Sequence, residues 1–463
     1  MILEKLIQGI KKNWALLSIA CLLIFTLVYH SRWNAINKDD QPIFYDVLSY
    51  YEYLPAVFIH GDLSFKFLES GKVDSSVVPL YWTKQLGNGK KLIKTTMGWA
   101  YLNIPAFFVG HLAAKLLGYN PDGFSKPYQV AVAFNVVLFV IIGLYSLLEI
   151  LQVYFSARVS VISLFVITFG TNLFHYTVCA NPVTHGYNFT LITLFLFVTI
   201  QWFASFRVKY LYCMVLLFCL ILLIRPTNFI IAVIPLLFAV HRANFIRTQF
   251  DWIRKYKLHI LLAGILGFLV VFPQLLYWKI QTGSWIFNSY VGERFIWDRP
   301  MVYEFLFSFR KGWFLYTPMM LFALIGFVMK KEQLNNLLPQ IFILLVVVVW
   351  MNSCWWCWWF GGSFGARTMV DFYGLFALPL AIFIEYTVSK HYMLKICTFT
   401  VFLFLIYVNI FQSYQVLTSL IHWDGMTKAA YWEVFLKNTY PQNYEKLLNY
   451  PDYEAALEGK VVR

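Results

Sequence analysis

Apolar runs of roughly 18 or more residues recur along the chain and are separated by short polar connections. A helix of that length crosses the hydrocarbon core of a bilayer while satisfying its own backbone hydrogen bonds. The pattern predicts spans over about 13–30, 128–151, 158–178, 186–205, 208–224, 227–241, 258–280, 313–330, 337–352, 369–389 and 392–413. We therefore expect an all-α polytopic membrane protein with about 11–13 transmembrane helices.

Two stretches interrupt this pattern and are expected to lie outside the bundle. The first is a long polar loop, in which residues 43–59 are aromatic and half apolar, as suits helices lying at the membrane interface. The second is a polar, tyrosine-rich tail. The predicted parts are a cytoplasmic N-terminus with the first transmembrane helix (1–30), a first extracytoplasmic loop (31–127), a transmembrane bundle (128–413) and an extracytoplasmic C-terminal tail (414–463).

The composition agrees with a membrane protein and argues against several functions. The 463 residues are 60% hydrophobic and 13% charged, whereas soluble domains carry about 25% charged residues. The net charge of +14 lies mainly in short loops between spans, so we expect no nucleic-acid partner. The sequence contains no P-loop, no dinucleotide-binding fingerprint and no paired Cys/His zinc spacing. Chemistry driven by intracellular nucleotides is therefore not expected.

The basic loops also predict an orientation. With the N-terminus inside, these loops can all be cytoplasmic only if residues 97–117 do not fully cross the membrane. That stretch is apolar but contains Pro105 and His111, and we interpret it as re-entrant or interfacial. The outward face then collects most of the unusual polar residues, so an active site would open outward.

The first loop contains the candidate catalytic residue, Asp46. Tyr50 and Glu52 follow it closely, and Gly61-Asp62 comes after a further stretch of the loop. A carboxylate at the membrane–water boundary can act as a general base on an acceptor hydroxyl. The alternative is a solvated acid that caps an interfacial helix.

The spacing Asp46-x3-Tyr50-x10-Gly61-Asp62 resembles the first extracytoplasmic loop of GT-C superfamily glycosyltransferases. That superfamily includes the bacterial lipid A aminoarabinose transferases and protein O-mannosyltransferase-like enzymes. In it, the aspartate of this motif lies at the catalytic centre and faces a polyprenyl-phosphate sugar. Val47 stands where the family often has glutamate. The resemblance implies a GT-C-like fold whose long first loop carries interfacial helices.

A second segment, running from Trp358 through Gly361-Gly362 and Gly365 to Arg367, is similar to a glycine-rich segment of bacterial GT-C-like membrane proteins. The glycines allow the backbone to approach a ligand closely. Arg367 would stand at the outer end of a span with its guanidinium available to a phosphate. The alternative is an arginine that snorkels beside an aromatic belt.

Four further residues are candidates for binding. Arg310 and Lys311 precede a span and are placed to meet a phosphate at the bilayer surface, or they anchor the interface. Arg225 interrupts an apolar stretch, where arginine is costly and is usually paired or functional. His185 stands roughly where the family commonly carries an acidic residue. It could bind phosphate, orient the acceptor, bind a metal or simply make one hydrogen bond at a helix end.

The resemblance implies an inverting glycosyltransferase in a bacterial inner membrane, with its site facing the periplasm. The donor would be a polyprenyl-phosphate sugar, and the acceptor a glycan, lipid or protein. No cofactor follows from the motifs, and a divalent metal stays an open alternative. The expected roles are Asp46 as catalytic base; Arg367, Arg310, Lys311 and Arg225 as donor-phosphate ligands; and Tyr50, Glu52, Asp62 and His185 as acceptor ligands. The competing hypotheses are a flippase for lipid-linked glycans and a non-catalytic subunit of an envelope-glycan machine.

Overall fold

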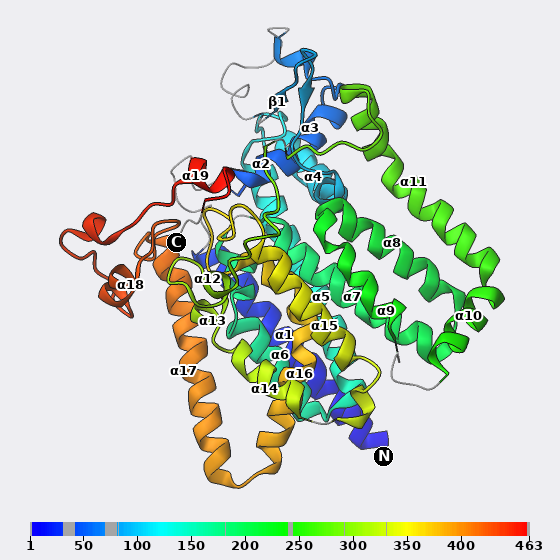
Figure 1. The fold of residues 1–463 in the computed structure, drawn as a ribbon, viewed down its shortest axis with the longest axis vertical. Coiled ribbons are helices and arrows are strands. Elements are labelled where there is room, and N and C mark those ends of the chain that lie inside the picture. The colour runs from blue at the N-terminus through cyan, green and yellow to red at the C-terminus, as the bar shows by residue number, and fades with distance from the viewer. Residues whose placement is uncertain are drawn as a thin grey trace.

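The computed structural model describes residues 2–30, 42–69, 81, 83–180, 182–238, 244–290, 292–329 and 331–460. Its described part is a bundle of helices with one small two-stranded ribbon, which confirms the predicted all-α architecture (Figure 1). Residues 31–41 and 70–80 of the predicted first loop lie outside the described residues.

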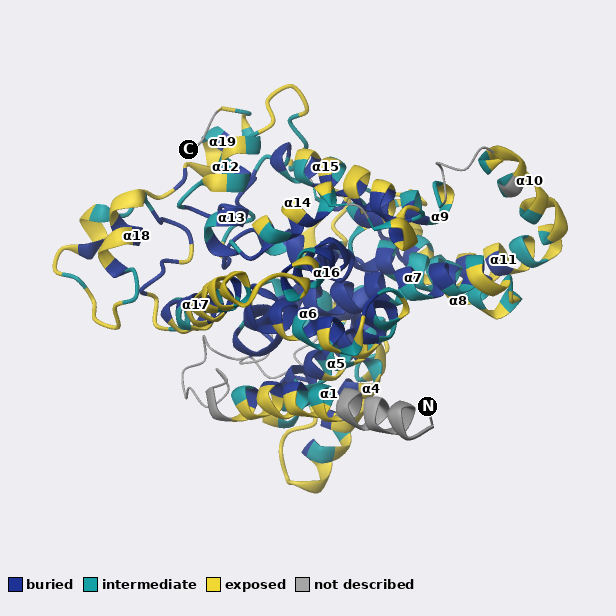
Figure 2. Ribbon diagram, turned by 90° about the horizontal axis from the view of Figure 1, so that it is seen from below, coloured by how far each residue is buried: buried dark blue, intermediate teal, exposed yellow. Residues whose placement is uncertain are grey.

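Three helices form the centre of the bundle: α5 (Lys126–Tyr154), α7 (Thr184–Ser205) and α16 (Tyr373–Ser389). Of these, α7 and α16 lie among the most buried ribbons of Figure 2. Small residues allow their backbones to approach closely, as is common between membrane helices. A Cβ atom at Gly143 of α5 would lie 2.7 Å from Thr190 Oγ1 of α7, and one at Gly374 of α16 would lie 2.0 Å from Thr193 Oγ1.

Other helices surround this centre: α1 (Ile2–His30), α6 (Ala157–Phe169), α8 (Val208–Ile224), α11 (Lys257–Thr282), α14 (Met320–Val328), α15 (Leu338–Ser353) and α17 (Tyr392–Leu417). The most apolar stretches of α11 and α17 are only 22% and 28% buried within the protein. Their exposed leucines and phenylalanines are suited to face lipid.

Five helical segments of the described chain are long and apolar enough to cross a membrane: α5, α7, α11, α17 and the segment Arg367–Ser389, which joins η8 (Arg367–Phe372) to α16. Five shorter apolar helices accompany them. They include α6, α8, α15 and residues Trp14–Val28 of α1. The multi-pass prediction therefore holds, although fewer of the predicted spans are continuous helices than expected.

Two of the expected spans are divided into shorter elements, one of them at a proline. The expected span 313–330 consists of α13 (Trp313–Tyr316) and α14, which are separated at Thr317-Pro318. The expected span 227–241 begins with η6 (Pro226–Ala232) and a single turn, α9 (Val233–Leu236), while residues 239–241 lie outside the described part.

The first loop packs on one end of the bundle, at the top of Figure 1. Its elements are α2 (Asp46–Tyr51), α3 (Tyr53–Phe58), η3 (Lys66–Glu69), the antiparallel strands β1 (Lys84–Gln85) and β2 (Lys91–Leu92), and α4 (Gly98–Leu116). α4 runs antiparallel to the first half of α5, with Asn135 bonded to Asn103 and His111 to Tyr128. The interpretation of this stretch as re-entrant or interfacial stays a prediction.

The remaining elements are short: the π-helical turn η5 (His175–Cys179), α10 (Phe245–Lys255), α12 (Val302–Phe307), η7 (Glu332–Leu334), α18 (Lys428–Val434), η9 (Tyr444–Leu447) and α19 (Tyr453–Leu457). The last three belong to the C-terminal tail.

The contact between α14 and α16 yields a prediction about stability. A Cβ atom at Gly326 would lie 1.8 Å from the carbonyl oxygen of Pro379, a backbone atom that cannot rotate away. We expect Gly326→Ala to destabilise the protein by about 1–3 kcal/mol. Gly264 of α11 has no atom near its missing Cβ, so Gly264→Ala should leave the melting temperature unchanged or raise it. Thermal unfolding of both variants in detergent checks this, and equal melting temperatures would contradict it.

Candidate active site

Asp46 and Arg367 meet across 321 residues of sequence and form an ion pair. Asp46 Oδ2 accepts a hydrogen bond from Arg367 Nη1 at 3.1 Å. The carboxylate side chain is 46% exposed and the guanidinium side chain is 19% exposed, so a ligand can reach both. Asp46 opens α2, and Arg367 opens η8. The two segments with the strongest family resemblance therefore converge at one place.

The residues before Arg367 form a strap, residues 361–366, which is held in a fixed shape. Its carbonyl at Phe364 accepts hydrogen bonds from Asn172 Nδ2 at 3.0 Å and from the Tyr176 hydroxyl at 3.2 Å. The same hydroxyl accepts from Phe364 N at 2.8 Å. Gly365 has a φ of +60°, and a Cβ there would lie 2.8 Å from Tyr316 Cβ. The strap therefore requires glycine at this position.

A second carboxylate, Asp371, lies four residues beyond Arg367 in η8 and is only 1% exposed. Its Oδ1 lies 2.7 Å from His185 Nδ1. Its Oδ2 accepts from the side-chain amides of Asn188 and Asn228, each at 2.9 Å, and lies 4.0 Å from Arg225 Nη1. Residues from α7, η6, η8 and the end of α8 thus meet on one buried anion.

Asp371 also sets the hydrogen-bonding state of His185. An ionised carboxylate can only accept hydrogen bonds, so His185 Nδ1 must carry the proton. In the neutral imidazole, Nε2 is then the acceptor nitrogen. The histidine is 2% exposed and stacks edge-on against Tyr176, with ring centroids 5.2 Å apart.

Sequence reasoning missed Asp371 as a site residue, although a signal was present. The residue lies inside a predicted span, 369–389, and an ionisable residue within a membrane segment is a functional-site candidate by default.

Arg225, Tyr50 and Tyr290 complete the surroundings of the ion pair. Arg225 follows the last residue of α8, and its guanidinium carbon lies 5.9 Å from the ring centre of Phe360, just before the strap. The charges of Asp46, Arg225 and Arg367 all act on the half-buried Tyr50 hydroxyl. Burial, together with nearby Tyr290 and Asp46, raises the pKa of Tyr50 well above its usual range. Tyr50 is therefore a hydrogen-bond donor at neutral pH.

Another ion pair lies beside Tyr290. Lys94, just before α4, pairs with Glu293, and its ammonium lies 4.8 Å from the ring centre of Tyr290. Trp356 Nε1 donates to the same glutamate at 3.2 Å. These residues tie the first loop to the connection between α11 and α12.

Two predicted acceptor ligands lie apart from the ion pair. Asp62 accepts hydrogen bonds from Ser64 N at 2.7 Å and Lys66 N at 2.9 Å, and so caps η3. Partial burial alone would raise the pKa of Asp62, but these hydrogen bonds lower it. Glu52 is fully buried at the junction of α2 and α3. Their binding roles stay predictions.

Arg310 and Lys311 are engaged by protein carbonyls and lie almost wholly buried, at 3% and 2% exposure. Arg310 Nη1 donates to the carbonyl of Asp424 at 2.8 Å. Lys311 Nζ donates to the carbonyl of Ser363 and, at 2.6 Å, to that of Trp423. The structure thus brings Arg367 and Arg225 to the ion pair with Asp46, while Arg310 and Lys311 contact the C-terminal tail.

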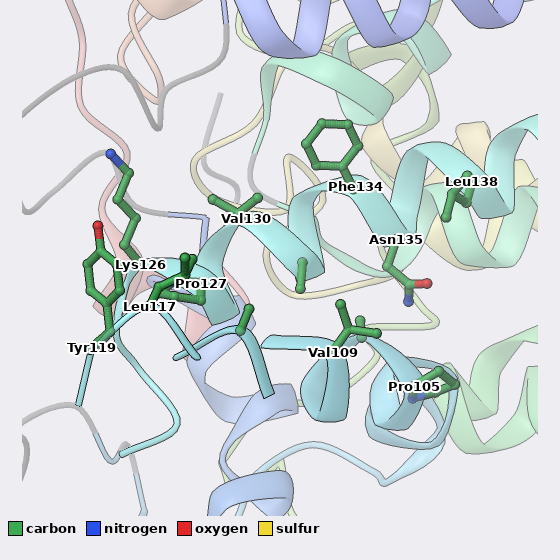
Figure 3. A pocket seen from close by; sticks show the side chains of 13 residues that line it. Pro105, Val109, Leu117, Tyr119, Lys126, Pro127, Val130, Phe134, Asn135 and Leu138 are labelled. Carbon is green, nitrogen blue, oxygen red and sulfur yellow. The ribbon is translucent and has the colours of Figure 1, made fainter. Parts of the chain in front are cut away.

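An apolar groove of about 530 Å³ runs between α4 and the first half of α5 (Figure 3). Val109, Leu117, Val130, Phe134 and Leu138 line it, with Tyr119 and Lys126 at one end and Asn135 near the other. Its volume is within the range of ligand pockets. A chain of contacts through Asn103, Tyr187 and Trp99 joins Asn135 of this groove to Tyr50.

In the described part of the chain, no group of three or more His, Cys, Asp or Glu side chains is arranged to hold a metal ion. His185 is bonded to Asp371, and its predicted roles in phosphate, acceptor or metal binding stay predictions.

No protein-family model matches the chain, and no curated protein matches it. Among solved structures, the apo form of an Archaeoglobus fulgidus oligosaccharyltransferase is similar over 94% of this chain, at 12% identity and a TM-score of 0.49. The chain spans 59% of the length of that oligosaccharyltransferase chain. A likeness of this degree assigns no residue a role.

Asp371 yields a prediction about stability. Asp371→Asn removes the buried charge and points an amide group at donors, which leaves polar groups without partners. We expect a loss of about 3 kcal/mol, seen as a lower melting temperature in detergent. Asp298, whose side chain is 76% exposed, supplies the matched control Asp298→Asn, which should unfold like the wild type. If Asp371→Asn has the same melting temperature as the control, the buried anion does not organise the site.

Lys311 yields a prediction about pH. Burial lowers the pKa of Lys311 to about 7, Arg310 and Arg367 act in the same direction, and Asp424 opposes them. An unfolded lysine titrates near 10.4, so between about pH 7 and 10 the unfolded state binds more protons. The contribution of Lys311 to the unfolding free energy therefore rises with pH, by at most about 1.4 kcal/mol per unit. Melting temperatures across this window should show the rise in the wild type, and Lys311→Met should lack it.

Proposed function

We propose that the chain is an integral-membrane glycosyltransferase, which moves a sugar from a polyprenyl-phosphate donor to an acceptor hydroxyl on the outer side of a bacterial inner membrane. The observation that carries the proposal is the accessible pair of Asp46 and Arg367, contributed by two separate segments. A candidate base and a candidate phosphate ligand lie 3.1 Å apart, which suits a reaction that needs both at one centre.

The reaction would proceed as a single displacement with inversion. The acceptor oxygen forms a bond to the anomeric carbon while the bond from that carbon to the phosphate oxygen breaks, and the bonding electrons leave with the phosphate. The acceptor proton passes to Asp46. Arg367 and Arg225 face the negative charge that develops on the leaving phosphate, and Tyr50 supplies a hydrogen-bond donor nearby.

The ion pair also suggests why donor binding should precede proton transfer. An arriving phosphodiester competes with Asp46 for the guanidinium of Arg367. When the phosphate accepts hydrogen bonds from part of the Arg367 guanidinium, the Asp46 carboxylate is free to accept a proton from the acceptor hydroxyl. Donor binding would thus prepare the base.

The other predicted ligands have less direct roles in the proposed reaction. The proposal assigns the donor phosphate to Arg367 and Arg225, because Arg310 and Lys311 already donate to protein carbonyls. The apolar groove between α4 and α5 offers the polyprenyl chain a path beside the site. His185, held by Asp371, lies within the electrostatic range of both arginines and is a candidate contact for acceptor or phosphate.

Assays of sugar transfer and of donor-lipid binding distinguish the roles of Asp46 and Arg367. Asp46→Asn should retain undecaprenyl-phosphate binding and lose transfer by about 100- to 10,000-fold, because the base is removed. Arg367→Gln should weaken that binding by about 10- to 100-fold. Binding is measured in lipid nanodiscs. Transfer is measured as the release of polyprenyl phosphate from a panel of polyprenyl-phosphate sugars in native membranes.

The exposed pair Arg247 and Asp251 of α10 supplies matched controls. Arg247→Gln and Asp251→Asn should behave as the wild type in both assays. Undiminished sugar release by Asp46→Asn would refute its role as the base. Unchanged binding by Arg367→Gln would refute the phosphate site and favour the flippase or subunit hypotheses.

A further inference from the structure

One buried ammonium group joins the C-terminal tail to the strap before Arg367. Lys311 lies in the turn between α12 and α13, and its Nζ donates to Ser363 of the strap and to Trp423 of the tail. The Trp423 carbonyl also accepts from Ser363 N at 3.3 Å. Three segments distant in sequence therefore meet at a single carbonyl and a single lysine.

A second set of contacts lies beside the first, and together the two sets form the seam between the tail and the strap. The backbone carbonyl of Asp424 accepts a hydrogen bond from Arg310, and the carboxylate oxygen Oδ2 of Asp424 accepts one from the Tyr453 hydroxyl at 2.9 Å. Trp359 Nε1 donates to that hydroxyl at 3.4 Å, and the Arg310 guanidinium lies 5.7 Å from the centre of the Trp359 ring. The tail is thus attached to the segment that leads into the strap as well as to the strap itself.

The seam is only four residues from the proposed phosphate ligand. Phe364 is fixed from the bundle side by Asn172 and Tyr176, whereas Ser363 is fixed from the tail side by Lys311. Between these anchors and Arg367 lie only Gly365 and Ala366. Loss of the Ser363 contact would therefore leave the strap, and the start of η8 that follows it, held from the bundle side alone.

A buried lysine is a costly way to make this connection. Its positive charge is desolvated, and a neutral hydrogen-bonding side chain would avoid that cost. The terminal nitrogen nevertheless offers three donors when charged and two when neutral, so in either form it can hold two carbonyls from different segments at once. The lowered pKa of Lys311 reflects the cost of burial.

We propose that Lys311 is a positioning residue, which fastens the C-terminal tail to the strap and thereby holds Arg367 in place for a lipid-linked phosphate. The inference rests on the proposed function, since it assumes that Arg367 binds phosphate. It gives the tail a part in the site without any direct contact with the donor, and it separates Lys311 from the phosphate ligands.

The first experiment measures undecaprenyl-phosphate binding in nanodiscs together with hydrogen exchange of residues 361–366. Lys311→Met keeps the length of the side chain but removes all three donors. It should weaken binding about tenfold and speed exchange in the strap. Lys437→Met is the control, because Lys437 is also in the tail but makes an exposed ion pair with Glu433 at 3.0 Å. This control should change neither quantity.

A covalent rescue distinguishes positioning from direct phosphate binding. A Cβ atom at Gly362 would lie 3.2 Å from the Trp423 ring, so Gly362→Cys with Trp423→Cys puts two thiols on neighbouring segments, and mass spectrometry measures the fraction that oxidation joins. In the Lys311→Met background, oxidation should restore the affinity and reduction should remove it again. If the oxidised protein still binds weakly, Lys311 acts otherwise and the proposal is overturned.

Two further variants keep the outcomes separate. If Arg367→Gln binds undecaprenyl phosphate normally, the proposed function fails; if it binds weakly while Lys311→Met binds normally, only the positioning role fails. Should Lys311→Met not fold, Tyr453→Phe loosens the same seam at Asp424 and should speed exchange in the strap. Wild-type exchange in that variant would overturn the proposal.

Discussion

A buried carboxylate needs donors around it, and the need of Asp371 for them organises the site. Its two oxygens face the imidazole of His185, two asparagine amides and the guanidinium of Arg225. Those groups come from α7, η6 and the end of α8, which pack against one another, so one anion helps to set how their ends meet. Arg367 stands four residues before Asp371 in η8, so the placement of Asp371 also sets the position of Arg367.

The architecture could be predicted from the sequence because hydrophobic run length and basic loops are one-dimensional signals. They correctly predicted helices such as α5, α7 and α17, and the gap between spans at Arg225-Pro226, but not the break at Pro318, because an apolar run that contains a proline still has the hydropathy of a span. The meeting of Asp46 with Arg367 was expected from the family resemblance alone. No local pattern connects residues 321 positions apart.

Residue roles were harder to anticipate than segments. Arg310 and Lys311 have the same sequence signature as Arg367, namely cations beside an aromatic span end. Only the packing of the tail, through Trp423 and Asp424, distinguishes them. For Asp371 the sequence shows an ionisable residue within a span, but not its partners, which come from three other segments and meet only in the folded chain.

The pairing of charges at the site has a consequence for how a ligand would arrive. Asp46 offsets Arg367, and Asp371 lies against Arg225, so the site has little net field of its own. Soluble phosphates would gain little from long-range attraction, which depends on uncompensated charge. A ligand that is already confined to the bilayer does not need such steering, because lateral diffusion brings it to the helix ends at a high local concentration. Charge balance of this kind would favour membrane-borne substrates over their water-soluble counterparts before any sugar or acceptor is recognised.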